Sequence, residues 1–139
     1  MERNICVDVS VLAKWFASEE GREVAAALRH HLSAGAVLSL PGSWVLELGS
    51  AFYHKALEGT ADLEAAGDWL EEAASMPMEV VPLEELVQPA IRLAVEYRIT
   101  VWDAVHLVVA LDRDADFFTA DNRLYGRVRS LPKVHLVSW

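Results

Sequence analysis

Four acidic residues stand where an α/β sheet could bring them together. Asp103 is charged within the otherwise apolar stretch ITVWDAVHLVVAL (99–111), and a buried, unpaired charge is costly. Asp8 lies at the carboxyl end of the first predicted strand, Asp121 comes just past the end of another, and Glu47 lies in the opening turns of a predicted helix. Clustered carboxylates take up protons or bind a cation, and an all-oxygen set suits Mg²⁺ or Mn²⁺. The four residues therefore predict a divalent metal site.

Such a site would perform phosphodiester hydrolysis without a covalent nucleophile from the protein. A divalent ion held by carboxylates can activate water and offset the charge that develops on the transition state and the leaving oxygen. Lys14, six residues after Asp8, and Arg123, two after Asp121, are the nearest basic residues in the sequence. We expect them as weak candidates for phosphate contact, since exposed basic side chains are ordinarily only solvated.

Each acidic residue also has an ordinary structural explanation. Thr100 and Asp103 fit a capping box, and Asp8 and Asp121 could cap strand-to-helix turns. Glu47 falls outside the apolar stripe of its helix and would be solvated there. That stripe consists of Trp44, Val45, Leu48, Ala51 and Phe52. The functional interpretation therefore depends on all four acids sharing one edge of the sheet.

Short apolar runs alternate with helical patterns along the chain, which is typical of βα units around a parallel sheet. Strands are predicted in NICVD (4–8), AVLSL (36–40), MPMEVVPL (76–83), ADFFTA (115–120) and KVHLV (133–137). Helices are predicted after Asp8 with Ser10 as cap, over 19–35 closed by Gly35, over 44–59 capped by Ser43, from Thr60 to about Ala74, over 83–98, over 101–113, and after Asp121. The carboxyl ends of parallel strands form the edge where ligands bind.

Composition limits the possible classes of protein. The 139 residues, 53% of them hydrophobic, predict a single domain over 1–139. Twelve Lys and Arg against 21 Asp and Glu give a net charge of −9, which opposes a broad grip on nucleic acid and requires local substrate contacts. No apolar run approaches the ~20 residues of a membrane span, and the N-terminus lacks a signal-peptide pattern, so we expect a cytoplasmic protein. Cys6 is expected to be a buried strand thiol.

Two other features of the sequence resemble parts of known kinds of metal site. DRDADFFTADNR begins like a calcium loop, but Phe117 stands where glycine is needed and Arg123 replaces the closing glutamate. His106 lies one helical turn after Asp103 and could orient a ligand, although without an H-E-x-x-H partner a histidine is more often part of the core or the surroundings of a site. Neither motif predicts a calcium or zinc site.

Four stretches resemble the acidic motifs of the PIN-domain family, in the order and at about the spacing found in VapC-type toxins. They are ICVDVSVLAKWF, SWVLELGSAF, ITVWDAVHLVVAL and FFTADNRL, and together they cover essentially the whole chain. The resemblance implies an α/β/α sandwich with a central parallel sheet, a Mg²⁺- or Mn²⁺-dependent endoribonuclease, and frequent homodimers. It maps the catalytic, metal-binding acids onto Asp8, Glu47, Asp103 and Asp121, with Ser10 and Thr119 as neighbouring hydroxyls.

We therefore expect the toxin half of a toxin–antitoxin pair, which cleaves RNA and is bound by an antitoxin that carries a basic or Arg-bearing segment. The alternative is a noncatalytic acidic interaction module whose carboxylates cap helices and whose acidic face binds a basic protein. A phospho-accepting receiver domain is a third possibility. It would require paired acidic residues after the first strand and a clear lysine at a late strand end, which the chain lacks.

Overall fold

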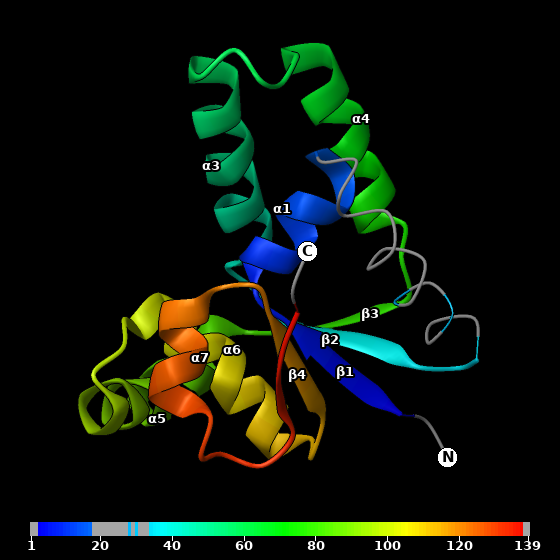
Figure 1. Ribbon diagram of the computed structural model, residues 1–139. Coiled ribbons are helices and arrows are strands. Elements are labelled where there is room, and N and C mark those ends of the chain that lie inside the picture. The colour runs from blue at the N-terminus through cyan, green and yellow to red at the C-terminus, as the bar shows by residue number, and fades with distance from the viewer. Residues whose placement is uncertain (1–2, 18–27, 29, 31–33, 138–139) are drawn as a thin grey trace.

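The computed structural model describes residues 3–17, 28, 30 and 34–137, which form one five-stranded sheet with helices packed on it (Figure 1). The strands are β1 (Asn4–Val7), β2 (Val37–Pro41), β3 (Met78–Val81), β4 (Asp116–Thr119) and β5 (Val134–Leu136). Their order is β3-β2-β1-β4-β5, and every neighbouring pair is parallel. The predicted parallel sheet is confirmed. Four strands lie within the predicted runs, and β2 extends one residue beyond its run, to Pro41.

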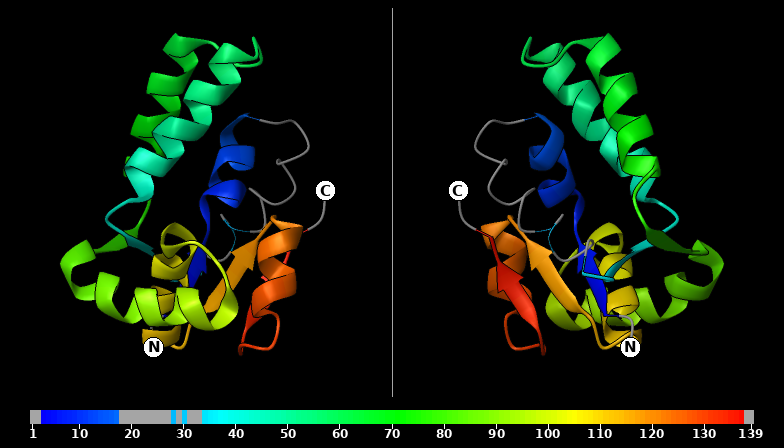
Figure 2. Two further views of the ribbon diagram at one scale, coloured as in Figure 1. Left: turned by 90° about the vertical axis from the view of Figure 1, so that its left-hand side faces the viewer. Right: turned by 90° about the vertical axis from the view of Figure 1, so that its right-hand side faces the viewer.

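Helices cover both faces of this sheet. Successive side chains of the central strand point to opposite faces, and because these side chains are apolar, both faces must be covered. Ile5 and Val7 pack with α1 (Val9–Ala17), α3 (Trp44–Leu57) and the end of α4 (Leu63–Ala74). Cys6 packs on the other face with α5 (Leu83–Tyr97), α6 (Val101–Asp112) and α7 (Asn122–Val128). Figure 2 shows the two layers from the sides. The predicted α/β/α sandwich is therefore confirmed.

The helices α3 and α4 extend beyond the sheet as an antiparallel pair (Figures 1 and 2). Phe52 and Trp69 join them, with ring centroids 5.2 Å apart. Because only a narrow face of α3 is covered, Trp44, Leu48 and Phe52 are buried, whereas Val45 is 48% exposed. The prediction that Val45 belongs to the buried stripe is wrong.

Two predicted helix starts differ from the structure. Asp62, and not Thr60, caps α4 by accepting a hydrogen bond from the Glu64 backbone N–H. The Thr60 hydroxyl instead donates to the carbonyl oxygen of Lys55, 3.0 Å away, and so helps to close α3. Ser10 is not a cap but lies inside the first turn of α1. In both cases the hydroxyl that was predicted to cap a helix donates a hydrogen bond instead, Thr60 to the Lys55 carbonyl oxygen and Ser10 to the Asp8 carboxylate.

Three further expectations concern single segments. The predicted helix over 19–35 lies mostly outside the described residues. Cys6 is buried as predicted, and burial raises the pKa of its thiol to about 12. Among the described helices, none has the length and apolar character that a membrane span requires.

Candidate active site

The candidate site lies where the order of the strands reverses. From β1 the chain proceeds to β2 and β3 on one side, and β4 then returns to the other side of β1. In open α/β sheets the crevice at such a switch point, at the carboxyl ends of the strands, is the usual place for a ligand. Asp8 directly follows β1, and Asp121 follows β4 by two residues, so both lie at this crevice.

Asp8 is the most enclosed of the four acids, with only 4% of its surface exposed. Its Oδ1 accepts hydrogen bonds from the Ser10 hydroxyl and, at 3.3 Å, from the Val11 backbone N–H, while its Oδ2 accepts from the Thr119 hydroxyl. Burial raises the pKa of the Asp8 carboxyl, although these hydrogen bonds favour its ionised form. Asp8 is thus a buried carboxylate with both oxygens held in place.

The two hydroxyls also join the ends of the two central strands. Ser10 Oγ accepts a hydrogen bond from the Ala120 backbone N–H at 3.1 Å. Thr119 Oγ1 accepts one from the Asp121 backbone N–H at 3.0 Å. Each hydroxyl therefore donates to Asp8 and accepts from the turn that carries Asp121, which couples the positions of the two acids.

Asp121 is the N-cap of α7, as its structural explanation predicted. Its Oδ1 accepts from the backbone N–H groups of Arg123 at 2.9 Å and Leu124 at 3.1 Å. The side chain is exposed, and Oδ2 makes no hydrogen bond within the described part of the chain. One oxygen therefore organises the helix, while the other remains open to a ligand.

Asp103 lies in the first turn of α6, but its carboxylate is not the cap of that helix. The Thr100 hydroxyl oxygen caps α6 by accepting from the Asp103 backbone N–H at 3.1 Å. Burial is the largest effect and raises the pKa of the Asp103 carboxyl, and the hydrogen bond of Thr100 opposes it. The negative charges of Asp8 and Asp121 raise the pKa further, and His106 lowers it. The structure thus places three of the predicted acids within electrostatic range of one another.

Glu47 joins the site through a histidine rather than through direct contact with the other acids. His106 Nε2 lies 2.7 Å from Glu47 Oε2, and the Ser43 hydroxyl donates to the same oxygen at 3.3 Å. Only 12% of the Glu47 side chain is exposed, so the expectation of an ordinary solvated glutamate is wrong. His106 is 2% exposed and is also close enough to Asp8 and Asp103 to affect the pKa of both carboxyls. His106 therefore lies between Glu47, which it contacts, and the carboxyls of Asp8 and Asp103, which its charge affects.

The donor chemistry of the site fits a hard divalent cation, because the groups offered are carboxylate oxygens that repel one another. Within residues 3–17, 28, 30 and 34–137, however, no three His, Cys, Asp or Glu side chains lie in an arrangement that would hold a metal ion as it stands. The four acids share an edge of the sheet, but their side chains would have to close around an ion.

A pocket of about 370 Å³ opens beside Asp103 and Asp121, and three arginines line it. They are Arg98, Arg123 and Arg127. Of these, only Arg123 was expected near the site. The spacing of four residues between Arg123 and Arg127 in a predicted helix was a signal for the second, whereas Arg98 comes from a different helix. Lys14 lies on α1 and is not part of the lining of this pocket.

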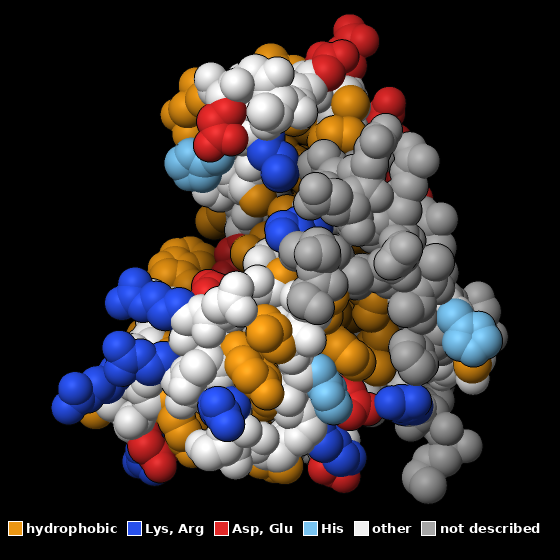
Figure 3. All heavy atoms as spheres, in the orientation of Figure 1, with side chains coloured by type: hydrophobic (Ala, Val, Ile, Leu, Met, Phe, Trp, Pro, Cys, Tyr) orange, Lys and Arg blue, Asp and Glu red, His pale blue; other side chains and the backbone are white. Residues whose placement is uncertain are grey.

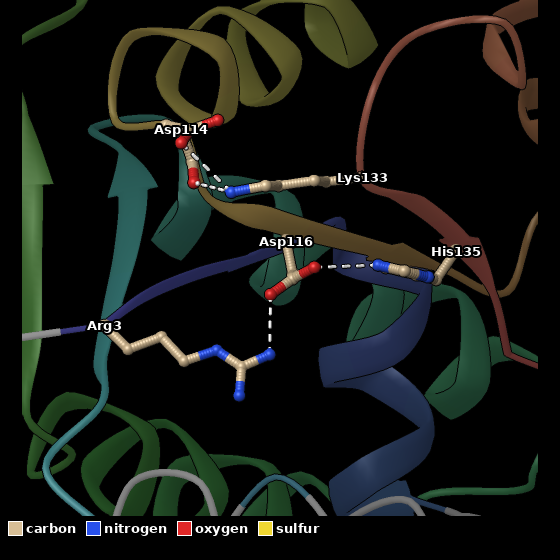
Figure 4. Close-up of polar contacts among 5 residues, drawn as sticks. All are labelled: Arg3, Asp114, Asp116, Lys133 and His135. Atoms are coloured by element: carbon tan, nitrogen blue, oxygen red, sulfur yellow. Dashed lines mark hydrogen bonds and ion pairs between the residues drawn. The ribbon is translucent and has the colours of Figure 1, made fainter.

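The acidic residues that begin DRDADFFTADNR have a different role at the opposite edge of the sheet (Figure 4). Asp116 accepts hydrogen bonds from Arg3 at 2.7 Å and from His135 at 2.9 Å. Lys133 Nζ lies 3.1 Å from Asp114 Oδ2. These pairs connect β1, β4 and β5 at their amino-terminal ends, and so they are structural rather than part of the candidate site.

Comparison with known proteins agrees with this fold. Residues 5–129 match the model of the PIN domain family. The fold is similar to that of PAE2754 from Pyrobaculum aerophilum, with a TM-score of 0.68 and 24% identity over 99% of this chain and 92% of that one. It is also similar to a chain of a toxin–antitoxin complex from Klebsiella pneumoniae, with a TM-score of 0.59 and 14% identity over 96% and 99%. No curated protein matches the sequence.

Proposed function

Because this chain belongs to the PIN-domain family, whose members are typically nucleases, we propose that it is a metal-dependent endoribonuclease of the cytoplasm and the toxin of a toxin–antitoxin pair. The observation that supports the proposal is that Asp8, Asp103 and Asp121 share the edge of the sheet at the switch point. Burial raises the pKa of the Asp103 carboxyl most, and the charges of Asp8 and Asp121 are near enough to raise it further. Clustered carboxylates with perturbed pKa values are typical of functional sites.

The carboxylates of Asp8, Asp103 and Asp121, together with Glu47, would hold the ion. When bound, Mg²⁺ or Mn²⁺ supplies a water of lowered pKa and positive charge near the phosphate oxygens. Ser10 and Thr119 fix the orientation of Asp8 by donating to both of its oxygens. A protein of net charge −9 has no general attraction for RNA, so the strand must be held by the few basic groups near the acids.

The proposal is tested by RNA cleavage and thermal melting with and without Mn²⁺. We expect the parent protein to cut a single-stranded RNA only with Mg²⁺ or Mn²⁺, and Asp8→Asn and Asp121→Asn to lose this activity by orders of magnitude. Asp112→Asn is the control, because Asp112 is exposed at the end of α6 and does not line the site. Absence of both cleavage and stabilisation by Mn²⁺ would favour the noncatalytic acidic module instead.

The proposed antitoxin would insert a basic segment into the carboxylate cluster, since a guanidinium can pair with carboxylates and exclude the metal or the substrate. Similarity of the fold to a chain of a toxin–antitoxin complex supports such a partner. The protein encoded next to this chain should bind it and inhibit cleavage. The toxin assignment fails if no neighbouring gene product inhibits the protein and its expression does not slow growth.

We also propose that the protein forms a homodimer through α5. Val87, Ile91 and Val95 follow one another at intervals of four residues on that helix, and 40%, 49% and 75% of their surfaces are exposed. An apolar hollow of about 140 Å³ lined by Val87 and Trp102 continues this surface, and contiguous exposed apolar surface marks interaction sites. Sedimentation should show a dimer that Ile91→Glu converts to a monomer; an unchanged dimer would place the contact elsewhere.

A further inference from the structure

The pocket beside Asp103 and Asp121 contains positive and negative side chains that do not neutralise one another. Arg98 follows α5, while Arg123 and Arg127 lie one turn apart on α7, and all three line the pocket. In the part of the chain that the structure describes, none of the three guanidinium groups forms an ion pair or a hydrogen bond. The arginines and the carboxylates thus share one hollow without pairing.

Two of the described arginines outside the pocket do pair with carboxylates: Arg3 pairs with Asp116, and Arg113 pairs with Glu79. In Figure 3, basic side chains gather on the left, over the region of α5 and α7, next to a recess in which acidic side chains are visible. Three unpaired guanidinium groups on a protein of net charge −9 form a local positive surface that an anion can occupy.

We propose that the pocket of Arg98, Arg123 and Arg127 binds a backbone phosphate of single-stranded RNA next to the bond that is cut. This inference rests on the proposed ribonuclease function for its ligand. A guanidinium offers two parallel N–H donors to phosphate oxygens, and Asp103 and Asp121, which line the same pocket, would hold the proposed ion. The arginines therefore orient the strand, and the carboxylates give the site its requirement for a cation.

The shape of the pocket favours an unpaired strand over a duplex. Its volume of about 370 Å³ is in the range of small-ligand sites, so it admits one nucleotide rather than a groove of paired bases. Ile99 is partly exposed and adds apolar surface to the lining, against which a sugar or an unstacked base can pack. Recognition of splayed nucleotides in such pockets is the usual mode for single-stranded RNA.

The test measures binding of a fluorescein-labelled single-stranded oligoribonucleotide in Mn²⁺ by anisotropy, in a Glu47→Ala background that prevents cutting. We compare Arg123→Ala/Arg127→Ala with Arg92→Ala/Arg129→Ala, a pair of exposed arginines outside the pocket that changes the net charge equally. The pocket pair should bind about tenfold or more weakly. For the variant with the pocket pair replaced, the slope of the logarithm of the binding constant against the logarithm of the salt concentration should become shallower by about 1.4. This change corresponds to two lost phosphate contacts on a single strand.

The results separate this inference from the proposed function. Equal binding by the two arginine pairs, or no binding by the Glu47→Ala protein, overturns the pocket as a phosphate site even if the parent cuts RNA. Arginine-dependent binding by a protein whose parent never cuts RNA supports the pocket and removes the nuclease. A duplex of the same sequence that binds equally well would overturn the preference for a single strand. Should the alanine pair melt at a lower temperature than the parent, Arg123→Gln/Arg127→Gln replaces it.

Discussion

His106 Nε2 lies 2.7 Å from Glu47 Oε2, although 59 positions separate the two residues in the sequence. His106 is buried in α6, and Glu47 lies in the first turn of α3. These two helices pack on opposite faces of the sheet. The contact therefore passes over the carboxyl edge, where the candidate site lies. An ionised carboxylate can only accept, so Nε2–H donates, and Nδ1 is buried without a hydrogen-bond partner among the described residues.

This contact predicts that His106 positions Glu47. Loss of a histidine or carboxylate that orients a metal ligand typically costs 10- to 100-fold in activity or metal affinity, and we expect a loss of about that size in RNA cleavage for His106→Ala. Because the Glu47→Ala protein does not cut RNA, the comparison in that background measures Mn²⁺ affinity, and the loss of affinity caused by His106→Ala should nearly vanish there, since the two residues act as a unit. Val109→Ala, a buried change on the same helix, controls for a folding defect. Equal losses with and without Glu47 would contradict this role.

Asp103→Asn separates the two explanations of Asp103. The Thr100 cap uses the backbone N–H of Asp103, which asparagine retains, so helix α6 should be unaffected. Removing one charge that Asp8 and Asp121 repel should keep the melting temperature of the metal-free protein level or raise it at pH 7. Parent protein at 100 times Kd of Mn²⁺ should gain about 2.7 kcal/mol, and the variant should gain less and cut RNA far more slowly.

A different result would assign Asp103 to structure alone. That result is a variant that melts lower without metal, gains as much from Mn²⁺ as the parent and still cuts RNA. The exposed Asp112→Asn serves as the matched control on the same helix. Both melts are to be run in EDTA and in Mn²⁺.

Asp116 predicts a pH-dependent contribution to stability. Burial raises the pKa of this carboxyl, but the hydrogen bonds and charges of Arg3 and His135 outweigh burial and hold the pKa below its ordinary value. The stabilisation is fully present above the unfolded-state pKa of about 3.9 and is lost as the pH falls through the lower folded-state pKa. Asp116→Asn should therefore lower the urea midpoint at pH 6, and the difference from the parent should shrink below about pH 3.9. A difference that grows in acid would contradict the assignment.

Arg98 predicts a conflict between stability and binding. Its φ of 55° at the end of α5 is the left-handed conformation that glycine adopts more readily. Arg98→Gly should therefore have a urea midpoint equal to or higher than that of the parent, with a gain in the free energy of unfolding of up to about 1 kcal/mol. The same variant should bind single-stranded RNA more weakly. Arg98→Ala is the matched control, since it removes the same charge but keeps the strained backbone, and it should lose binding without gaining stability. Unchanged RNA binding in both variants would remove Arg98 from the pocket.

Local sequence patterns predicted the layers, the five strands and the edge at which the acids would meet. Alternating apolar runs and helical periodicity depend on neighbouring residues, and so the chain itself carries them. The ordinary explanations of Asp121 and Thr100 as caps were local as well, and the structure contains both caps. Two predictions were wrong. The helix was predicted to begin at Thr60, but the Thr60 hydroxyl binds a backbone carbonyl oxygen of the preceding helix instead. Val45 was predicted to be buried, but the neighbouring helices cover only part of the apolar face to which it belongs.

Tertiary structure alone decided which side chains touch at the site. The return of β4 to the far side of β1 brings the Thr119 hydroxyl to Asp8 across 111 positions, and it places the α7 arginines beside Arg98 of another helix. The contact between His106 and Glu47 likewise depends on two helices meeting over the edge of the sheet. Such contacts follow from the order of the strands in the sheet, which local sequence periodicity does not encode. Burial also decided the site, because it enclosed Glu47, which the local pattern had placed on a solvated surface.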